Sequence, residues 1–581
     1  MTRESQIQLK LSNTKAGVPL MTGDLGYDEY AGTLSPLGYV NLDALNQAPA
    51  GTFRYVRIHN IFTSKEGDGR GARDAGGDPV RIKPDGSHYY DWTIIDMVCQ
   101  AILDAGCTPF LELGFTPTPW SNMEEIMAVP IEDYPLELQY KLSRKKKGHP
   151  GAYPPKDKSL WGDLVYSFAI HVQEKFGKEA SSWPCELWNE PDIGYFKGTA
   201  EDYSALWDVT YDACKKAGMK IVGGPGVAHF SGLMKKFLEH CVKVNRHPDF
   251  VSYHVKGGNA GTMVANMYQM YNYMLQGREQ IPEELKDKPI WITEFDPIVG
   301  CENGIPNGPK WAFHNKSYYA SWLGKACYMI AILQQSIFIY ENKQDPDIEP
   351  LSVAAIFNDG HHITAECAPF YGARNLTTPI WIESDTEKTH DPLKELKENI
   401  DLEKEQPAFA AMLKDLDFRE YRPDEPDKYV LKALPKPIFR AFEYTRLLKG
   451  KHLPFFDKEN EVYGILSHDG GFINLCINVQ DDELENEEPV DCVVNIDLKG
   501  SGAKTPEVVL SARIDKTSCN PFETWKEMDE PYDLTRVQAK ILQDSTIPKP
   551  ANITDLQASK DEISFKISML GHSFNFLRFR V

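Results

Sequence analysis

The sequence predicts an α/β chain: a (β/α)8 TIM barrel with an accessory C-terminal β-sandwich that an N-terminal strand joins. Three observations support this. Short apolar segments alternate with helical patterns eight times, which is typical of a (β/α)8 barrel. Two of these segments end in glutamates. From residue 451 onward, segments with strand alternation are separated by turn residues, as in a β-sandwich.

At 581 residues the chain is too long for one hydrophobic core, so several domains are expected. We expect residues 1–14 to form the strand that joins the sandwich, because Gln6–Leu11 alternates polar and apolar side chains far from the other strand patterns. Residues 15–380 would form the catalytic barrel. Residues 381–450 would form a charged excursion and the final barrel helix, and residues 451–581 the β-sandwich.

The barrel strands are expected at eight short segments. They are Leu20–Gly23, Tyr55–His59, Thr108–Leu113, Cys185–Asn189, Lys220–Gly224, Phe250–His254, Ile290–Glu294 and Val353–Phe357. Among the helices between them, the one expected over 200–217 carries an apolar and aromatic stripe. Gly218 follows it in the usual position for a helix stop.

Composition and charge limit the class of protein. A net charge of −21 argues against nucleic acid or an anionic membrane surface as the main partner. The sequence contains no run of 18 apolar residues, so no transmembrane helix is predicted. The first residues lack an apolar signal region, so a soluble, cytoplasmic or already processed chain is expected. Eleven singly scattered cysteines, several inside apolar segments, indicate a reduced core rather than a disulfide framework.

Two glutamates stand at the ends of predicted barrel strands. Glu190 follows Trp188-Asn189 and precedes Pro191, and Glu294 follows a buried run at 290–293. The carboxyl ends of barrel strands form the active-site face, and retaining glycosidases need two carboxyls about 5–5.5 Å apart. We expect Glu294 to be the nucleophile and Glu190 the acid/base, with a pKa raised by apolar neighbours and the second carboxylate. Either glutamate alone could be a carboxylate at the edge of the barrel that forms an ion pair. Two glutamates at matching strand ends favour a catalytic pair.

Other polar residues at strand ends are candidates for substrate binding. Asn189 has the amide needed to bind a sugar hydroxyl, although an asparagine before such a turn can also serve the turn itself. His59 ends the second strand, with Arg57 on the same side, and His254 ends the sixth. A single histidine is more often structural, but two on the presumed active face favour binding.

No metal site and no cofactor are predicted. The histidines are dispersed, and neither an H-E-x-x-H motif nor a cysteine cluster is present. The glycine-rich segment at 223–226 lacks the spacing and the lysine of a phosphate loop.

Four strand-end motifs together resemble glycoside hydrolase family 39, which comprises retaining β-D-xylosidases and α-L-iduronidases. They are Arg57-Ile-His59, Trp188-Asn-Glu-Pro191, Gly223-Gly-Pro-Gly226 and Thr293-Glu294, in this order. The resemblance covers about residues 15–450. It implies Glu190 as acid/base and Glu294 as nucleophile, the same roles that the residues themselves indicate.

Three further segments are similar to the α-L-iduronidase branch of that family. They are Ser252–Gly257, Glu294–Gly300 and Phe357–Asp359 followed by Pro369-Phe370. This similarity implies that Lys256, the backbone of Gly300 and Arg374 hold the carboxylate of a uronic acid, and that Asp359 contacts the sugar. Arg374 lies one position off the ungapped match, and Asn358-Asp359 could instead be a plain turn.

The sequence therefore predicts a retaining exo-glycosidase that cuts an equatorial bond at a non-reducing end of an oligosaccharide or glycoside. It favours α-L-iduronidase-like specificity, with a β-D-xylosidase as the alternative. A non-catalytic carbohydrate-binding protein is the remote alternative, disfavoured because both carboxylates are present. No oligomeric state is predicted.

Overall fold

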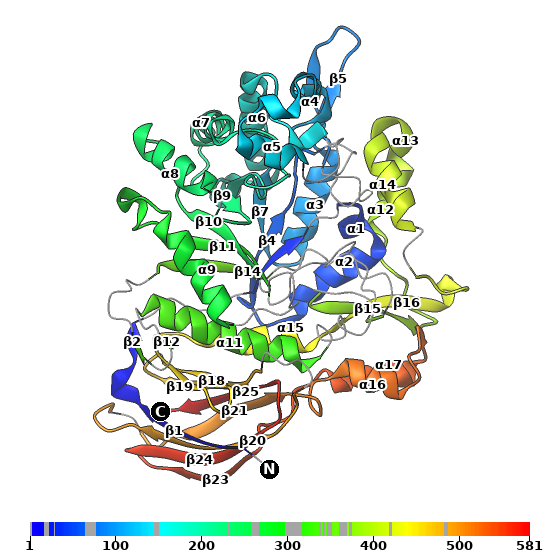
Figure 1. The fold of residues 1–581 in the computed structure, drawn as a ribbon. Helices are drawn as coiled ribbons and strands as arrows, with labels where there is room; N and C mark the ends of the chain where they lie inside the picture. The colour runs from blue at the N-terminus through cyan, green and yellow to red at the C-terminus, as the bar shows by residue number, and fades with distance from the viewer. Residues whose placement is uncertain are drawn as a thin grey trace.

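The structure is a computed structural model (Figure 1). It describes residues 3–16, 23–27, 30–63, 77–143, 150–230, 232–256, 267–296, 316–335, 339–340, 343–344, 351–358, 369–370, 375–417, 421–481, 486–502 and 504–581. Its two main bodies are a closed parallel barrel and a sandwich of two β-sheets. The predicted fold class is confirmed.

Eight parallel strands close the barrel, and each lies beside the next one along the chain. They are β3 (Gly23–Tyr27), β4 (Phe53–Ile58), β7 (Thr108–Leu113), β8 (Cys185–Leu187), β9 (Val222–Val227), β10 (Val251–Lys256), β11 (Ile290–Asp296) and β14 (Val353–Asn358). β14 pairs with β3 and so closes the ring. All their carboxyl ends therefore meet at one face of the molecule, as a barrel requires.

The helices of the barrel surround this ring (Figure 1). They are α1 (Tyr30–Leu34), α2 (Pro36–Asp43), α3 (Thr93–Asp104), α6 (Lys158–Phe176), α7 (Ala200–Lys216), α8 (Leu233–Lys243), α9 (Met267–Glu279) and α11 (Ser317–Gln334). The start of α7 has a capping box between Thr199 and Asp202, and its buried stripe includes Tyr203, Leu206 and Trp207. Among the helices that the structure describes, none is both long and apolar enough to cross a bilayer.

The first barrel strand differs from the prediction. Leu20–Gly23 was expected, whereas β3 spans Gly23–Tyr27. Two glycines and an aspartate give this segment low strand propensity, so the sequence pattern did not predict a strand at these positions. Packing requires the glycine: a Cβ at Gly23 would lie 2.2 Å from the Phe53 ring. Asp24 is buried and pairs with Arg54 at 2.8 Å, so its charge is compensated.

Two insertions follow barrel strands β4 and β7. A hairpin of β5 (Val80–Ile82) and β6 (His88–Tyr90) follows β4, and α4 (Met123–Met127) and α5 (Leu136–Ser143) follow β7. Both lie at the same end of the barrel in Figure 1. Because each follows the carboxyl end of a barrel strand, both extend that end of the barrel.

The C-terminal sandwich consists of two sheets with an apolar core between them. One sheet has the order β1-β20-β24-β23 and the other β2-β17-β18-β19-β25-β21. The strands are β1 (Arg3–Lys10), β2 (Lys15–Ala16), β17 (Lys451–Asp457), β18 (Val462–His468), β19 (Phe472–Val479), β20 (Val490–Asp497), β21 (Glu507–Ile514), β23 (Ile553–Ala558), β24 (Glu562–Met569) and β25 (Ser573–Arg580). β1 pairs in parallel with β20, so the predicted N-terminal strand of the sandwich is confirmed. In Figure 1 the dark blue β1 lies among the orange and red strands.

Two helices, α11 and α15 (Pro437–Thr445), lie between the barrel and the sandwich (Figure 1). Polar contacts bind α11 to the sandwich: Ser321 donates to the side chain of Gln480, and Gln335, just past the helix, donates to the carbonyl of His452 at 2.9 Å. The ammonium of Lys325 lies 4.6 Å from the centre of the Tyr463 ring. The sandwich therefore packs against one side of the barrel through these two helices.

A small third sheet joins the two bodies. Its order is β16-β15-β22, with β15 (Thr377–Glu383), β16 (Tyr429–Pro435) and β22 (Asp533–Leu534). The boundary expected between residues 380 and 381 falls inside β15. Two helices, α16 (Pro521–Glu527) and α17 (Arg536–Ser545), interrupt the sandwich segment, where we expected no helix. They cover β15, and Phe370, Ile380 and Trp525 share one apolar cluster.

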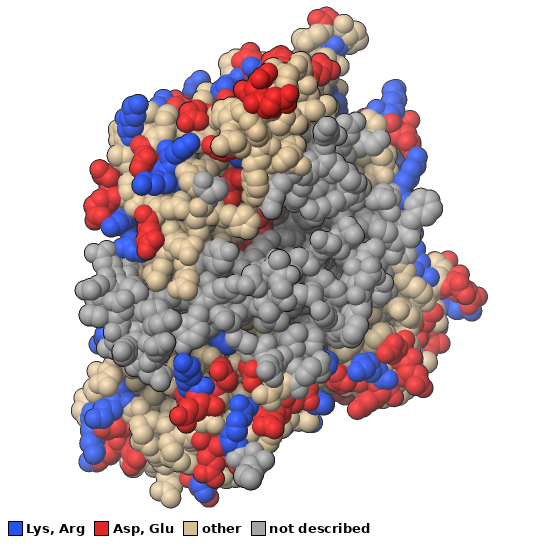
Figure 2. Space-filling model, in the orientation of Figure 1, with Lys and Arg blue, Asp and Glu red and all other residues tan. Residues whose placement is uncertain are grey.

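The charged excursion contains three helices, α12 (Pro392–Asn399), α13 (Leu402–Glu405) and α14 (Pro407–Asp417). Two short strands between α11 and β14, β12 (Ile339–Tyr340) and β13 (Lys343–Gln344), pair with each other. Figure 2 shows the molecule in the orientation of Figure 1, and over its described surface basic side chains lie among acidic ones. The net charge of −21 therefore does not gather in a single acidic patch in this view.

The nine cysteines at described positions are all buried, and none of them forms a disulfide. Burial raises the pKa of several of their thiols, for example that of Cys107 to about 12. These cysteines therefore act as small apolar residues of the core, as expected from their positions in apolar segments.

Candidate active site

The chain turns sharply where β8 ends, and this turn directs Glu190 into the barrel mouth. Trp188 and Glu190 both have left-handed backbone conformations, with φ of 69° and 44°. Non-glycine residues seldom adopt this conformation, so the surrounding packing must impose it. The Trp188 side chain is fully buried and its indole N–H donates to the carbonyl of Tyr195 at 3.0 Å. The Glu190 N–H donates to the carbonyl of Gly226 at 3.0 Å, which ties the turn to β9.

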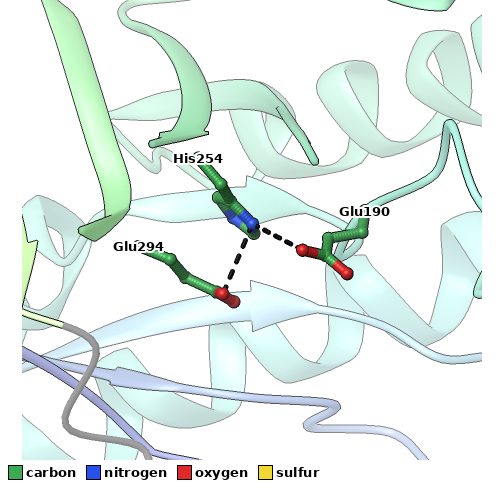
Figure 3. A group of neighbouring side chains, drawn as sticks. All are labelled: Glu190, His254 and Glu294. Atoms are coloured by element: carbon green, nitrogen blue, oxygen red, sulfur yellow. Dashed lines mark hydrogen bonds and ion pairs between the residues drawn. The ribbon is translucent and has the colours of Figure 1, made fainter. Parts of the chain in front are cut away.

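Glu190 and Glu294 face each other, with His254 between them (Figure 3). Nδ1 of His254 lies 3.0 Å from Oε1 of Glu190 and 3.4 Å from Oε2 of Glu294. One ligand atom from each of the three residues lies within 4.8 Å of the others. An inverting glycosidase needs about 6.5–9.5 Å between its carboxyls to hold a water, and a retaining enzyme about 5–5.5 Å. Oxygens of the two carboxylates thus approach each other more closely than the inverting arrangement requires.

The two carboxylates differ in exposure. The side chain of Glu294 is 2% exposed, and that of Glu190 is 12% exposed. An acid/base must reach both the leaving group and an incoming water, whereas a nucleophile needs only the sugar carbon. The difference in exposure fits this division of roles.

Glu294 is held asymmetrically. Its Oε1 accepts a hydrogen bond from Nη1 of Arg57 at 3.2 Å and lies 3.2 Å from Nε2 of His59. Its Oε2 faces His254 on the side of Glu190. The anchored oxygen is therefore Oε1, and Oε2 is the oxygen placed toward the reaction space.

Arg57 is fully buried and contacts four acceptor side chains. Its guanidinium donates to Glu186 at 2.7 Å, to Glu294, and to Oδ1 of Asn189 at 3.2 Å, and it lies 3.1 Å from Glu112. Burial alone would lower the pKa of this guanidinium, but the three surrounding carboxylates raise it above its ordinary value. Because Asn189 accepts with its oxygen, its NH2 group remains to donate to a substrate hydroxyl.

His59 lies between two carboxylates. Its Nδ1 is 3.1 Å from Oε2 of Glu112, and its Nε2 faces Glu294. Burial by itself would lower the pKa of this imidazole. The two carboxylates outweigh burial and the repulsion from Arg57, and they raise the pKa of His59 to about 9. The two carboxylates therefore favour the protonated form of the ring.

Sequence reasoning missed three acidic residues of this region. Glu112 and Glu186 lie inside β7 and β8 and are fully buried, and Asp192 is 2% exposed. Asp192 accepts the N–H groups of Ala228 and His229 at 2.8 and 2.7 Å, which ties the loops after β8 and β9 together. Burial raises its pKa to about 6. A glutamate within an otherwise apolar strand, as in Phe-Leu-Glu-Leu and Cys-Glu-Leu, was the available signal.

The structure brings together five of the nine predicted site residues: Glu190, Glu294, His59, Asn189 and His254. Lys256 ends β10, and only its backbone is described. Gly300, Asp359 and Arg374 lie outside the described residues. The subsite predicted for a sugar carboxylate therefore has no described geometry.

The donor chemistry of the central trio also suits a metal ion. Glu190, His254 and Glu294 offer a ring nitrogen and two carboxylate oxygens close together. Such donors bind several divalent cations. The sequence pattern predicted no metal site, so the trio is a candidate that experiment has to decide.

Residues 142–340 match the family model described as glycosyl hydrolases family 39. This segment includes Glu190, His254 and Glu294. The match confirms the resemblance predicted from the strand-end motifs.

Three curated proteins illustrate the relationship. A β-xylosidase of Caldicellulosiruptor saccharolyticus is 24% identical over 505 residues, which is 84% of this chain and 83% of that protein. A β-xylosidase of Geobacillus stearothermophilus is 28% identical over 42% of this chain and 47% of its own length. The α-L-iduronidase of Mus musculus is 32% identical over 24% of each chain.

Solved structures show the same fold. A monomeric β-xylosidase from Caulobacter crescentus has a TM-score of 0.63 at 19% identity and covers 99% of both chains. A bacterial orthologue of human α-L-iduronidase has a TM-score of 0.69 at 15% identity, covering all of this chain and 84% of that one. At such identities the likeness establishes the architecture and leaves the sugar undecided.

Proposed function

We propose that this chain, a glycoside hydrolase whose residues 142–340 match the family 39 model, is a retaining exo-glycosidase that releases β-D-xylosyl residues from non-reducing ends. One observation carries the retaining mechanism. Oxygens of Glu190 and Glu294 lie within 4.8 Å of each other in the mouth of the barrel, with His254 between them. So short a separation favours direct attack by a carboxylate over attack by a water held between a carboxylate and the sugar carbon.

In the first step, Oε2 of Glu294 attacks the anomeric carbon while Glu190 gives its proton to the glycosidic oxygen. The bond to the leaving group breaks, and a glycosyl ester on Glu294 forms. In the second step Glu190, now a carboxylate, takes a proton from water, and the water oxygen attacks the same carbon and displaces Glu294. Two inversions at one carbon give net retention.

The neighbouring residues support these roles. Arg57 and His59 hold Oε1 of Glu294 and favour its ionised form, because both present positive charge to it. Nδ1 of His254 lies against Glu190 at 3.0 Å and fixes the orientation of that carboxyl. The NH2 group of Asn189 can bind the sugar hydroxyl next to the reacting carbon.

The choice of xylose rests on the relatives. The named protein that shares the largest part of this chain, 84% of it, is a β-xylosidase, and so is the second. This support is stronger than that for the uronide expected from the sequence, whose subsite residues Gly300, Asp359 and Arg374 lie outside the described part of the chain.

A second candidate is hydrolysis of α-L-iduronides or other uronides. The segment shared with the mouse α-L-iduronidase has the highest identity of the three relatives, 32%, although it is short. Lys256 also stands two positions after His254 on β10, where an ammonium could meet a sugar carboxylate. Equatorial anomeric bonds are common to both substrates, so one catalytic pair serves either.

The decisive experiment follows the product anomer by NMR during hydrolysis of 4-nitrophenyl β-D-xylopyranoside. Early accumulation of β-xylose, before mutarotation, is the expected result. Early α-xylose would refute the retaining mechanism. The ratio of kcat/KM for this substrate and for 4-methylumbelliferyl α-L-iduronide then decides the sugar: a clear preference for the iduronide would replace xylose and leave the catalytic pair intact.

A further inference from the structure

A cavity of about 630 Å³ lies between the β5–β6 hairpin and the charged excursion, apart from the site described above. Three segments of the described chain form its walls: the hairpin with Arg81 and Tyr89, the turn after β7 with Thr118 and Pro119, and α13 with Lys404 and Glu405. Figure 1 shows the hairpin and α13 at the upper right of the molecule. The volume lies within the range of about 300–1,000 Å³ that is usual for ligand pockets.

Hydrogen bonds join the two sides of this cavity. Nη2 of Arg81, in the hairpin, donates to the side chain of Gln406 at 2.7 Å, and the Gln406 amide donates to Asp91 at 2.6 Å. Arg81 also forms ion pairs with Asp78 at 3.3 Å and with Asp91 at 3.7 Å. Gln406 is 3% exposed, so these bonds are shielded from water. The walls are therefore held in place by contacts between segments far apart in the chain.

Tyr89 offers an aromatic ring to the cavity. It stands directly opposite Arg81 in the hairpin, so the two side chains project from the same face of it. Tyr89 is 50% exposed, although Nζ of Lys83 lies 5.7 Å from the centre of its ring. One exposed tyrosine is ordinary. An exposed tyrosine in the wall of a cavity that also has charged side chains is the combination expected of a binding site.

The chain that leaves β4 connects the barrel mouth to this cavity. Thr63 follows His59 by four residues, so their Cα atoms lie at most about 14 Å apart. The carbonyl of Thr63 accepts the N–H of Asp78 at 3.1 Å, and Asp78 lines the cavity. The cavity wall therefore begins within a short distance of a residue that contacts Glu294.

The chain that leaves β7 gives a second connection. The ring of Phe115 packs against that of Trp188, with ring centres 5.0 Å apart, and Trp188 stands two positions before Glu190. Thr118 follows Phe115 by three residues, which span at most about 11 Å. Both connections place the cavity beside the barrel mouth, within reach of a short oligosaccharide that has its end at the catalytic pair.

A sugar ring suits the mixed chemistry of the walls. A xylopyranose has C–H groups on its faces and hydroxyls around its rim. One face can therefore pack against the ring of Tyr89 while hydroxyls meet charged side chains such as Lys404. An exo-glycosidase holds only the terminal residue of its substrate at the catalytic pair, so the rest of the chain extends on the side of the leaving group. A sugar of the same chain that reaches the cavity thus belongs to the leaving group.

We propose that the cavity between the β5–β6 hairpin and α13 is a remote subsite that binds a xylosyl unit of the leaving group, with Tyr89 packed against the sugar ring. The inference rests on the proposed function, because it takes the chain to be an exo-acting xylosidase. It deepens that function by giving the enzyme a preference for longer xylo-oligosaccharides and by naming the residues that produce it.

The test compares substrates with and without a sugar chain in the leaving group. KM and kcat are measured for 4-nitrophenyl β-D-xylopyranoside, xylobiose and xylotetraose with the wild type, Tyr89→Ala and Tyr89→Phe. Tyr140→Ala is the matched control. Tyr140 is 45% exposed in α5, at the same end of the barrel, and is not among the described residues that line the cavity.

We expect the wild type to have a lower KM for xylotetraose than for xylobiose. Tyr89→Ala should raise the KM for xylotetraose about 3–10-fold relative to that for the nitrophenyl xyloside, the usual contribution of one aromatic contact. kcat should change less than KM, because a contact far from the reacting carbon is equally strong before and in the transition state. Tyr89→Phe keeps the ring and should keep the preference, as should Tyr140→Ala.

A second variant tests the opposite wall of the cavity. Lys404→Ala, in α13, should weaken the same preference for xylotetraose, because it removes a donor to the sugar hydroxyls. Lys397→Ala is its control, since Lys397 is also exposed but belongs to α12. If Tyr89→Ala does not fold, as judged by circular dichroism, Lys404→Ala decides, and a preference that it leaves intact overturns the proposal.

The remaining outcomes separate this proposal from the proposed function. A wild type without a preference for xylotetraose, or a Tyr89→Ala enzyme that loses equally on all three substrates, refutes the remote subsite and leaves the xylosidase activity in place. If the wild type hydrolyses none of the three xylosides, the proposed function is wrong, and the assignment of a xylosyl unit to the cavity is wrong with it.

Discussion

The barrel and the sandwich both have apolar cores, but the barrel adds a cluster of buried charges. At the carboxyl ends of the barrel strands, Arg57, Glu112, Glu186 and Glu294 form a cluster of charges, each at most 2% exposed. The core between the two sandwich sheets consists of apolar side chains such as Val494, Phe565 and Leu577. The difference lies in what each interior has to do.

Burying a charge costs several kcal/mol unless partners compensate it, and apolar residues of similar volume often serve stability as well or better. The barrel therefore keeps charges where the chemistry requires them and pairs each one. The core between the sandwich sheets is stabilised mainly by apolar burial. Substitutions in the barrel cluster should thus reduce turnover more than stability, and substitutions in the sandwich core should do the reverse.

The largest effect is expected for Glu294→Gln. It keeps the shape of the side chain and removes the nucleophile, so kcat should fall on the order of 10⁴-fold or more. The apparent Tm should stay close to that of the wild type, because the change removes one of three carboxylates around two cations. The control is Glu239→Gln in α8, where the glutamate side chain is 57% exposed, and this change should leave kcat unchanged. Substantial turnover by Glu294→Gln would remove Glu294 from the mechanism.

The second effect depends on the substrate. Glu190→Ala should reduce kcat/KM about 10²–10⁴-fold for xylobiose, whose leaving group needs a proton, and far less for a dinitrophenyl xyloside. Comparison of these two substrates with one enzyme preparation controls for misfolding. Equal losses on both would contradict the acid/base role.

Azide sharpens the same assignment. With Glu190 shortened to alanine, a small anion can reach the glycosyl ester and needs no base, so azide should restore part of the turnover. The product should be a glycosyl azide of retained configuration. An azide product of inverted configuration would mean that the anion had displaced the leaving group directly and that no ester on Glu294 had formed.

Most of the architecture could be read from the sequence, because apolar strands and helical stripes alternate so regularly. The position of the proposed catalytic pair followed from Pro191 and from the buried run before Glu294, which place both glutamates at strand ends. Strand β1 followed from its alternation. In each case the information lies within a few neighbouring residues.

The parts that the sequence did not reveal depend on residues far apart in the chain. β3 is a strand because Phe53 leaves room for Gly23, and nothing near Gly23 shows this. Glu112 and Glu186 look unfavourable within their strands until Arg57, on a third strand, compensates them. The helices α16 and α17 lie inside a segment dominated by strands, and they are stabilised by contacts with β15.

A smaller effect on activity, with a large one on stability, is expected for Phe565→Ala in β24. Phe565 is 1% exposed and lies opposite Val494 in the apolar core. Its truncation should cost about 3–5 kcal/mol of unfolding free energy. At a temperature well below the transition, kcat/KM should be unchanged. Leu556→Ala on the neighbouring β23, where the side chain is 42% exposed, is the control and should change neither quantity. A loss of turnover in the folded Phe565→Ala enzyme would break the separation between the two bodies.

The smallest effect is expected on removal of metal ions. A divalent cation held by Glu190, His254 and Glu294 would occupy Oε1 of Glu190 and Oε2 of Glu294, the two oxygens that face His254. These are the oxygens that the mechanism needs to carry the proton and to attack, so such a cation would inhibit the enzyme. We therefore expect EDTA to leave kcat/KM of the purified enzyme unchanged and added Zn²⁺ to lower it. Activity lost in EDTA and restored by one particular metal would instead give the trio a role as metal ligands, and the barrel cluster would then have to be reinterpreted around that ion.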